Sequence, residues 1–293
     1  FAHHMMNELL NLDNTTIITI APWAGVFGDQ WRASAGINFT HQVFNGQSGL
    51  HFYPIANLSY DIVGNYVIPF FGFGGYLEDN NYSKILSENP WVNPGLNVAN
   101  TSHKFIIRGG IKGNFNPKAA YNLSASFSLI DSIYFYVNPI MDDSPNVLQN
   151  TFDVAYDSDV QRKHFKGELT VAPTNSINIF ISAEYSRYTL QDLDKPWHRP
   201  EYIGRCAAAY SINDWVIVRA AVHFEGGRLA RAANGAPIEL DAIVDANLGL
   251  EYRYNRRLSA LLDLNNLIGQ RNHIYYLYPM LGFNARFSVS YSF

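Results

Sequence analysis

An unusually long alternation of apolar and polar side chains is the feature that most restricts how this chain can fold. From Leu240 to Tyr254, leucine, alanine, valine and tyrosine occupy every second position, and most positions between them are Asp, Asn, Glu or Arg. Successive strand side chains point to opposite faces, so this period predicts a strand with one apolar and one polar face. Strands of soluble proteins average about 5–6 residues, whereas a tilted membrane strand needs about 9–11. The length therefore favours a strand that crosses a membrane.

The same period recurs along the chain, and turn signals separate its occurrences. Short signals such as Asn175-Ser176 alternate with longer polar connections, as in outer-membrane barrels, which have short turns on one side and long loops on the other. We therefore predict an all-β fold, a transmembrane antiparallel up-and-down β-barrel of about fourteen strands with aromatic girdles and long external loops. The other alternating segments are Trp31–Thr40, Lys104–Phe115, Tyr121–Leu129, Ile177–Tyr185, Val216–Phe224 and Phe283–Phe293, and the long connections are Glu78–Asn100, Asn138–Asn150, Leu190–Pro200, Gly226–Pro237 and Ile268–Leu281.

Composition excludes several other classes of protein. Charged residues make up only 16% of the chain, against about 25% in ordinary soluble domains, while 47% are hydrophobic and 15% aromatic. The apolar content and a net charge of −4 argue against disorder and against a nucleic-acid-binding protein. No apolar run approaches the roughly 18 residues of a transmembrane helix. A soluble β-sandwich or β-solenoid is the remaining alternative, and it would have shorter core strands and more exposed Lys and Glu.

The two edge strands of such a sheet cannot remain unpaired inside a membrane. An open strand edge in lipid leaves N–H and C=O groups unpaired, each at a cost of several kcal/mol. The strands must therefore close on themselves or be completed by residues outside this chain. We assign residues 1–10 to an N-terminal extension and residues 11–293 to the barrel.

The C-terminal third resembles the barrel of TonB-dependent outer-membrane receptors. Leu240–Asn247 is similar to the third-last strand of that family, and the penultimate and final strands are also matched. This resemblance implies a place in the outer membrane of a Gram-negative bacterium. The matching segments are Leu262–Ile268, Tyr278-Pro279 with Gly282, and Phe287–Phe293, and two shorter segments, Ser87–Val92 and Lys195–Trp197, look similar to smaller receptor-like barrels of Bacteroidetes-type bacteria.

The chain also departs from the family pattern. Full receptors resemble a 22-strand barrel with an N-terminal plug domain, and neither a plug nor a coupling box is recognisable here. We therefore expect a plug-less or truncated relative, and energised uptake is not implied. The terminal Phe293 resembles the signal that the barrel-assembly machinery reads, and it can also serve as a ring of the interfacial aromatic girdle.

Charged side chains on the polar faces are the candidate site residues. If the faces are assigned correctly, they line the lumen, either as a salt-bridge network that closes it or as the wall of a weakly selective pore. The candidates are Arg32, Lys104, Arg108, Lys112, Glu184, Arg219, His223, Asp241, Asp245, Glu251 and Arg253.

Signs of catalysis and of metal binding are weak. His223 and Glu225 could form an acid–base pair near a serine such as Ser182, but nothing in the sequence positions these groups together. His3-His4 with Met5-Met6, and the acidic Asp142-Asp143, lack the number of ligands that a built metal site requires. We expect no enzyme activity, no metal and no cofactor.

These observations favour a receptor-like or porin-like barrel for solute binding or transport across the outer membrane. The alternative is a non-enzymatic barrel subunit that holds other proteins of an outer-membrane assembly or export complex. The expected partners are membrane lipid, the barrel-assembly machinery through Phe293, and lipoprotein or barrel subunits, with no nucleic acid.

Overall fold

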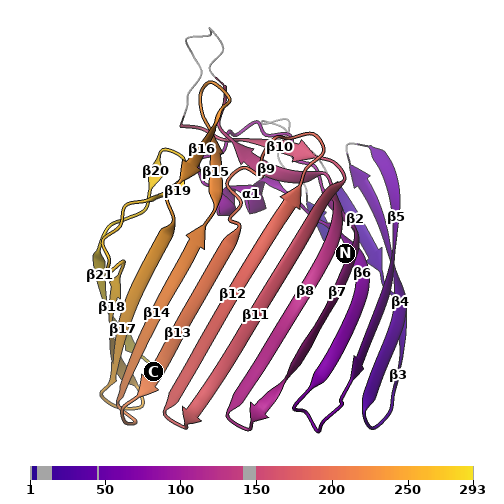
Figure 1. Cartoon of the computed structure of the whole chain (residues 1–293). Helices are drawn as coiled ribbons and strands as arrows, with labels where there is room; N and C mark the ends of the chain where they lie inside the picture. Colours follow the sequence, from indigo (N-terminus) through magenta and orange to yellow (C-terminus); the bar gives the residue numbers. More distant parts are fainter. Residues whose placement is uncertain (1, 5–14, 45, 141–149, 293) are drawn as a thin grey trace.

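The chain folds as one large curved antiparallel sheet (Figure 1). The computed structural model describes residues 2–4, 15–44, 46–140 and 150–292. The sheet has 15 strands, and most neighbours in the sheet are also neighbours along the chain, as in an up-and-down barrel. In order, the strands are β1 (Ala2–His4), β2 (Thr15–Ile20), β4 (Trp31–Phe44), β5 (Gln47–Tyr60), β6 (Ile68–Glu78), β7 (Thr101–Asn116), β8 (Ala119–Asp131), β11 (Val160–Thr174), β12 (Ile177–Thr189), β13 (Tyr202–Ser211), β14 (Val216–Gly226), β17 (Ile243–Arg253), β18 (Leu258–Asn265) and β21 (Asn284–Tyr291), and β3 (Trp23–Phe27) also pairs with β4.

Long strands in continuous register confirm the predicted barrel wall. β7 has 16 residues and β11 has 15, enough to cross a bilayer at a tilt. β4 and β5 pair without a break from Trp31↔Tyr60 to Phe44↔Gln47. The short turns that the sequence predicts lie together at the lower end of the strands in Figure 1.

β2 and β3 act as two halves of one strand. Both pair with β4, β2 along its second half and β3 along its first half. Between them Pro22 is pushed toward the neighbouring strand, and its carbonyl oxygen accepts a hydrogen bond from the N–H of Ile37. A Cβ atom on Gly36 would lie 2.6 Å from that oxygen, so this close approach requires glycine.

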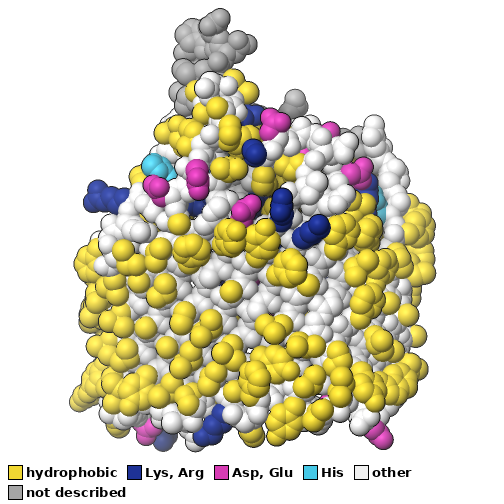
Figure 2. Space-filling view, viewed as in Figure 1, with side chains coloured by type: hydrophobic (Ala, Val, Ile, Leu, Met, Phe, Trp, Pro, Cys, Tyr) yellow, Lys and Arg dark blue, Asp and Glu magenta, His cyan; other side chains and the backbone are white. Residues whose placement is uncertain are grey.

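The outer face of the sheet is an apolar belt. Large hydrophobic side chains at alternate positions are exposed there, for example Leu248, Leu250 and Tyr252 on β17 and Phe287 on β21. Figure 2 shows this belt covering the strands, with charged side chains gathered above and below it. Such a surface matches a bilayer core bounded by two polar interfaces. Among the described residues, no helix has the length and apolar content to cross a membrane.

The longest predicted strand is two strands in the structure. β16 (Pro237–Leu240) ends before Asp241, and β17 starts only at Ile243. The residues between them leave the extended pairing, so the period over Leu240–Tyr254 is continuous in sequence but not in the sheet. The expected boundary after residue 10 lies outside the described residues, and Ala2–His4 of the expected extension pair with β2.

The long connections fold into a packed structure at the upper end of the barrel, here named the external cap (Figure 1). They contain the only helix among the described residues, and Trp197 of the connection 190–200 is buried there. The cap comprises α1 (Tyr82–Glu88), β9 (Ile133–Val137), β10 (Asp153–Asp157), β15 (Arg228–Arg231), β16, β19 (His273–Tyr275), β20 (Tyr278–Pro279) and the connection 190–200.

The main hydrophobic core of the described chain lies in this cap. All five residues of β9 are buried. Tyr134 and Tyr136 pack into one cluster with Ile85 of α1, and Phe135 packs into a second cluster with Trp197. Because both faces of β9 are covered, the strand has no alternation for sequence analysis to detect.

Candidate functional site

Strand register shows which predicted site residues share the inner face, opposite the apolar belt. Gly72, Arg108, Ser126, His164 and Ser186 face one another across five neighbouring strands, and none belongs to the belt. The same parity puts nine of the predicted residues on this face: Arg32, Arg108, Lys112, Glu184, Arg219, His223, Asp245, Glu251 and Arg253.

Two predicted residues lie elsewhere. Lys104 sits at a bulge in β7, at the rim next to the cap, and forms ion pairs with Asp131 at 3.3 Å and Asp159 at 2.6 Å. Asp241 lies between β16 and β17, beyond the spanning strands, and its backbone carbonyl accepts a hydrogen bond from Arg228. For both residues the structure corrects the assignment to the lumenal face, because the regular alternation is broken where they occur.

Most of the charges on one half of the inner face, from β11 to β21, form ion pairs, although Arg162 and Arg205 do not within the described chain. Lys166 contacts Glu168 at 2.8 Å and Glu184 at 3.6 Å. Glu251 accepts hydrogen bonds from Arg219 and Arg253. This half corresponds to the first alternative from the sequence, a salt-bridge network along the wall. Two more pairs are His223–Glu225 at 2.8 Å and Arg286–Asp263 at 2.9 Å.

The other half of the inner face, from β3 to β8, carries basic side chains that have no acidic partner in the part of the chain that the structure describes. It surrounds a cavity of about 970 Å³ whose lining includes Arg32, Arg108 and Lys112 and contains no carboxylate. Arg108 donates only a long hydrogen bond, 3.4 Å, to Oδ1 of Asn57, and the Lys112 ammonium lies 5.7 Å from the centre of the Phe70 ring. Among the described residues none of the three cations has an ion pair, so the cavity wall carries an uncompensated positive charge.

Aromatic side chains complete this cavity. Trp23 and Phe27 line it and are 73% and 81% exposed. By register they share the inner face with Arg32, since Phe27 pairs with Arg32 and Trp23 with Gly36. Such rings bind flat or apolar groups, while the cations attract anions. Sequence reasoning missed these two residues, although the period Trp23, Gly25, Phe27 could have indicated them.

Other inner-face charges were missed for a different reason. The segment that became β11 carries Lys163 and Gly167 on its outer face, which interrupts the apolar half of the alternation. The inner half is regular, with a charged residue or histidine at every second position from Arg162 to Glu168. The inner-face residues found only in the structure are Arg162, His164, Lys166, Arg205 and Asp263, whereas the alternation already indicated Glu168, Glu225 and Arg286.

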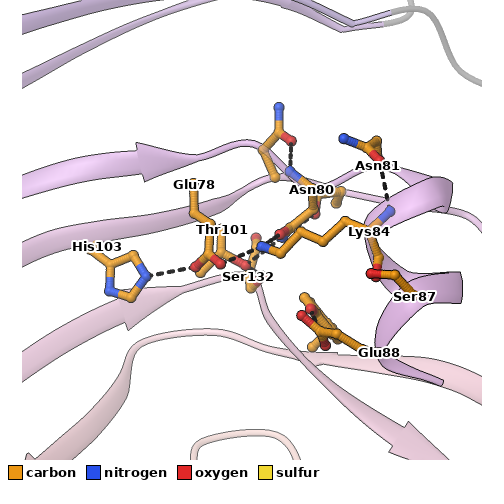
Figure 3. A network of polar contacts seen from close by, with 12 residues as sticks. Glu78, Asn80, Asn81, Lys84, Ser87, Glu88, Thr101, His103 and Ser132 are labelled. Carbon is orange, nitrogen blue, oxygen red and sulfur yellow. Dashed lines mark hydrogen bonds and ion pairs between the residues drawn. The ribbon is translucent and has the colours of Figure 1, made fainter. Parts of the chain in front are cut away.

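A polar cluster at the rim fixes α1 to the barrel (Figure 3). The Glu78 carboxylate accepts hydrogen bonds from Lys84 and, at 2.9 Å, from Nε2 of His103. Lys84 also donates to Asn80, whose amide donates at 2.8 Å to Oγ1 of Thr101. These hydrogen bonds connect α1 to β6 and β7, so the cluster stabilises the junction of barrel and cap.

The groups that could take part in catalysis or metal binding form no such site in the described part of the chain. Among the described residues, the only hydrogen-bond partner of the His223 ring is Glu225 at 2.8 Å, and Ser182 is buried opposite Arg205. No group of three potential metal ligands occurs in the described part of the chain. His3 and His4 belong to β1, whereas Met5-Met6 and Asp142-Asp143 lie outside the described residues.

Solved structures of outer-membrane receptors share this architecture. The siderophore receptor PirA from Acinetobacter baumannii matches 96% of the chain with a TM-score of 0.71 at 14% identity, and the chain covers 46% of that protein. The copper transporter OprC matches 96% with a TM-score of 0.70 at 12% identity, covering 48% of it. A mutant of the ferric enterobactin receptor PfeA from Pseudomonas aeruginosa matches 96% with a TM-score of 0.65 at 15% identity, covering 45% of it.

The chain thus spans less than half the length of these proteins. Its sequence matches no protein-family model and no curated protein. The predicted family resemblance is therefore confirmed at the level of the fold, across nearly the whole chain. The fold of this chain is that of the barrel wall of TonB-dependent outer-membrane receptors.

Proposed function

We propose that this chain forms part of the wall of an outer-membrane receptor and binds a small anionic solute on its way through the barrel. The observation that carries the proposal is the cavity in which Arg32, Arg108 and Lys112 have no carboxylate partner. In the other half of the same inner face, as far as the structure describes it, four of the six cations, Lys166, Arg219, Arg253 and Arg286, are paired with carboxylates, whereas Arg162 and Arg205 are not. Unpaired cations next to exposed rings suit a negatively charged solute with flat or aromatic groups.

The solved neighbours are described as receptors or transporters of siderophores and copper, which agrees with an uptake role. Iron bound by catecholate groups is a rigid, aromatic anion, and it fits the chemistry of Trp23, Phe27 and the three cations. The proposed role is binding and passage, with no covalent step and no resident cofactor. It places the protein in the outer membrane of a Gram-negative bacterium.

Calorimetry with the protein in a mild detergent and a ferric tris-catecholate complex tests this proposal. Arg108→Gln removes one unpaired cation, and we expect at least a tenfold loss of affinity, about 1.4 kcal/mol. The affinity should also fall as salt is added, because the attraction acts between solvent-accessible charges.

The matched control is Arg286→Gln, which removes one arginine from the paired half of the inner face. We expect the control to bind the complex as the unchanged protein does. Equal losses for both variants, or equal binding of a neutral complex of similar size, would show that Arg108 has no specific role in recognition.

The external cap favours a second candidate, a subunit of an outer-membrane assembly or export complex. Its core is formed by tightly packed connections such as β9 and α1, and these could present a rigid surface to a lipoprotein or to another barrel. Purification in mild detergent separates the two roles, since a scaffold should bring stable partner subunits and a receptor need not. Recognition of Phe293 by the barrel-assembly machinery remains a prediction, because Phe293 lies outside the described residues.

A further inference from the structure

Two basic side chains on the outer face of the barrel have no role in the proposed uptake. Lys163 of β11 and Arg187 of β12 are directly opposite each other in the strand register. Phe165 and Tyr185, the next outward residues on the same strands, also pair with each other. Side chains two residues apart on a strand share a face, so both cations point outward with these rings.

The placement is costly unless an anion compensates it. The Cβ atoms of directly opposed residues lie about 4.5–5.5 Å apart, and like charges at this distance destabilise a sheet. Both side chains are exposed, and among the described residues neither forms an ion pair or hydrogen bond. Their outer-face neighbours on β8, β11 and β12, by register, are Phe127, Gln161, Phe165, Tyr185 and Thr189, and none of these is acidic.

An apolar groove lies directly below this pair. It has a volume of about 770 Å³, and Phe165, Gly167, Ala183, Tyr185 and Tyr202 are among its lining residues. Gly167 and Ala183 pair with each other, and because their side chains are so small they form the floor of the groove between the aromatic rings. Figure 2 shows basic side chains at the upper border of the yellow belt, above a region where the surface between the hydrophobic side chains is white.

The position of the pair along the strands identifies the leaflet. Lys163 lies near the start of β11 and Arg187 near the end of β12, both at the end of the barrel that carries the external cap. Lys163 and Arg187 lie two residues along their strands from Phe165 and Tyr185, a distance of about 7 Å. The cations therefore lie at the level where lipid headgroups of the external leaflet meet the apolar belt.

We propose that Lys163, Arg187 and the groove below them bind a phosphate-bearing lipid of the external leaflet. One phosphate between the two cations would form charge-assisted hydrogen bonds to both, with the guanidinium able to bind two oxygens at once. An acyl chain would lie in the groove against Phe165, Tyr185 and Tyr202. The proposal rests on the membrane-spanning fold and does not depend on which solute the barrel carries.

Native mass spectrometry of the protein in mild detergent tests the proposal. The added probes are diphosphoryl lipid A, phosphatidylglycerol, phosphatidylcholine and inorganic phosphate. We expect retained adducts with the two anionic lipids and at least tenfold weaker binding of phosphatidylcholine and of free phosphate. Free phosphate binding as strongly as the anionic lipids would overturn the part that the groove plays.

Three variants divide the site into its parts. K163Q/R187Q should lower the affinity for anionic lipid at least tenfold. The control R256Q/R257Q removes the same charge from the turn at the opposite end of the barrel and should leave binding unchanged. Ala183→Leu fills the groove and should weaken lipid binding while both cations remain. Circular dichroism confirms that each variant is folded, and equal lipid binding by K163Q/R187Q and its control would refute the proposal.

Discussion

Among single residues, His198 has the most unusual surroundings. Its Nδ1 lies 2.9 Å from the carbonyl oxygen of Tyr136, and its Nε2 accepts the N–H of Tyr276 at 3.3 Å. This arrangement requires the neutral ring with the proton on Nδ1, which donates to Tyr136. Burial lowers the pKa of His198 to about 4, with a smaller contribution from the nearby Arg228, while the bond to Tyr136 opposes the shift. The ring therefore joins three cap segments only while it is uncharged.

From this we predict that acid loosens the cap. The unfolded histidine takes up its proton near pH 6.5 and the folded one only near pH 4, so stability is fully present above 6.5 and is lost as the pH falls toward 4. At pH 5 the loss is on the order of 2 kcal/mol. Hydrogen exchange of β9 and β19 amides, corrected for intrinsic rates, should be faster at pH 5 than at pH 7.

His198→Asn is the control for this prediction. The residue has a φ of 60°, a conformation that asparagine tolerates, and asparagine does not titrate in this range. The variant should exchange at the same corrected rate at both pH values. A cap whose exchange depends on pH equally in both proteins would contradict the role of His198.

At the scale of elements, β9 is the part of the cap on which the rest depends. Phe135 is fully buried and packs with Trp197, and the neighbouring Tyr134 and Tyr136 donate hydrogen bonds to the Glu88 carboxylate of α1. Burial raises the pKa of both tyrosines well above the usual value, so these donors keep their protons. One strand thus connects both hydrophobic clusters to the helix.

We predict that Phe135→Ala destabilises the cap by about 3–5 kcal/mol, the usual effect of deleting a buried phenyl ring. Limited proteolysis should then cut within the connections 79–100 and 190–200, while the barrel strands stay protected. Phe287→Ala is the matched control, because its ring is 69% exposed on the outer face. Equal protease sensitivity of the two variants would mean that the cap is not held by the packing around β9.

The elements that sequence analysis could predict are those with one apolar and one polar face. The segments Trp31–Thr40, Tyr121–Leu129 and Val216–Phe224 lie in β4, β8 and β14 as expected. β9 was not predicted because both of its faces are buried, and α1 was not predicted because it lies within Glu78–Asn100, which reads as a polar connection. For the candidate site, alternation along one strand indicates the inner face, but it does not indicate the register with the next strand. Pairing of Lys166 with Glu184, and the absence of any such partner for Arg108, therefore became visible only in the structure.

At the scale of the whole molecule, the two edges of the sheet decide how it can exist in a membrane. Among the described residues, β21 pairs only with β18, and no strand pairing joins it to β1, β2 or β3 at the other end of the sheet order. An unpaired edge in hydrocarbon costs several kcal/mol for each unsatisfied backbone group. A barrel wall of this length is therefore stable in lipid only if both of its edges are hydrogen-bonded, either to each other or to strands outside this chain.

We predict that, in a lipid nanodisc, the amides of Ala285–Ser290 exchange as slowly as those of the interior strand β12. Strand pairing on both sides of β21 would protect every amide, whereas an open edge would leave alternate amides unbonded and faster to exchange where water reaches them. The measurement is hydrogen exchange with residue-level resolution, with β12, which has neighbours on both sides, as the internal reference. Alternating fast and slow amides along β21 would show that the edge is open, and the sheet would then have to shield that edge by some means other than strand pairing.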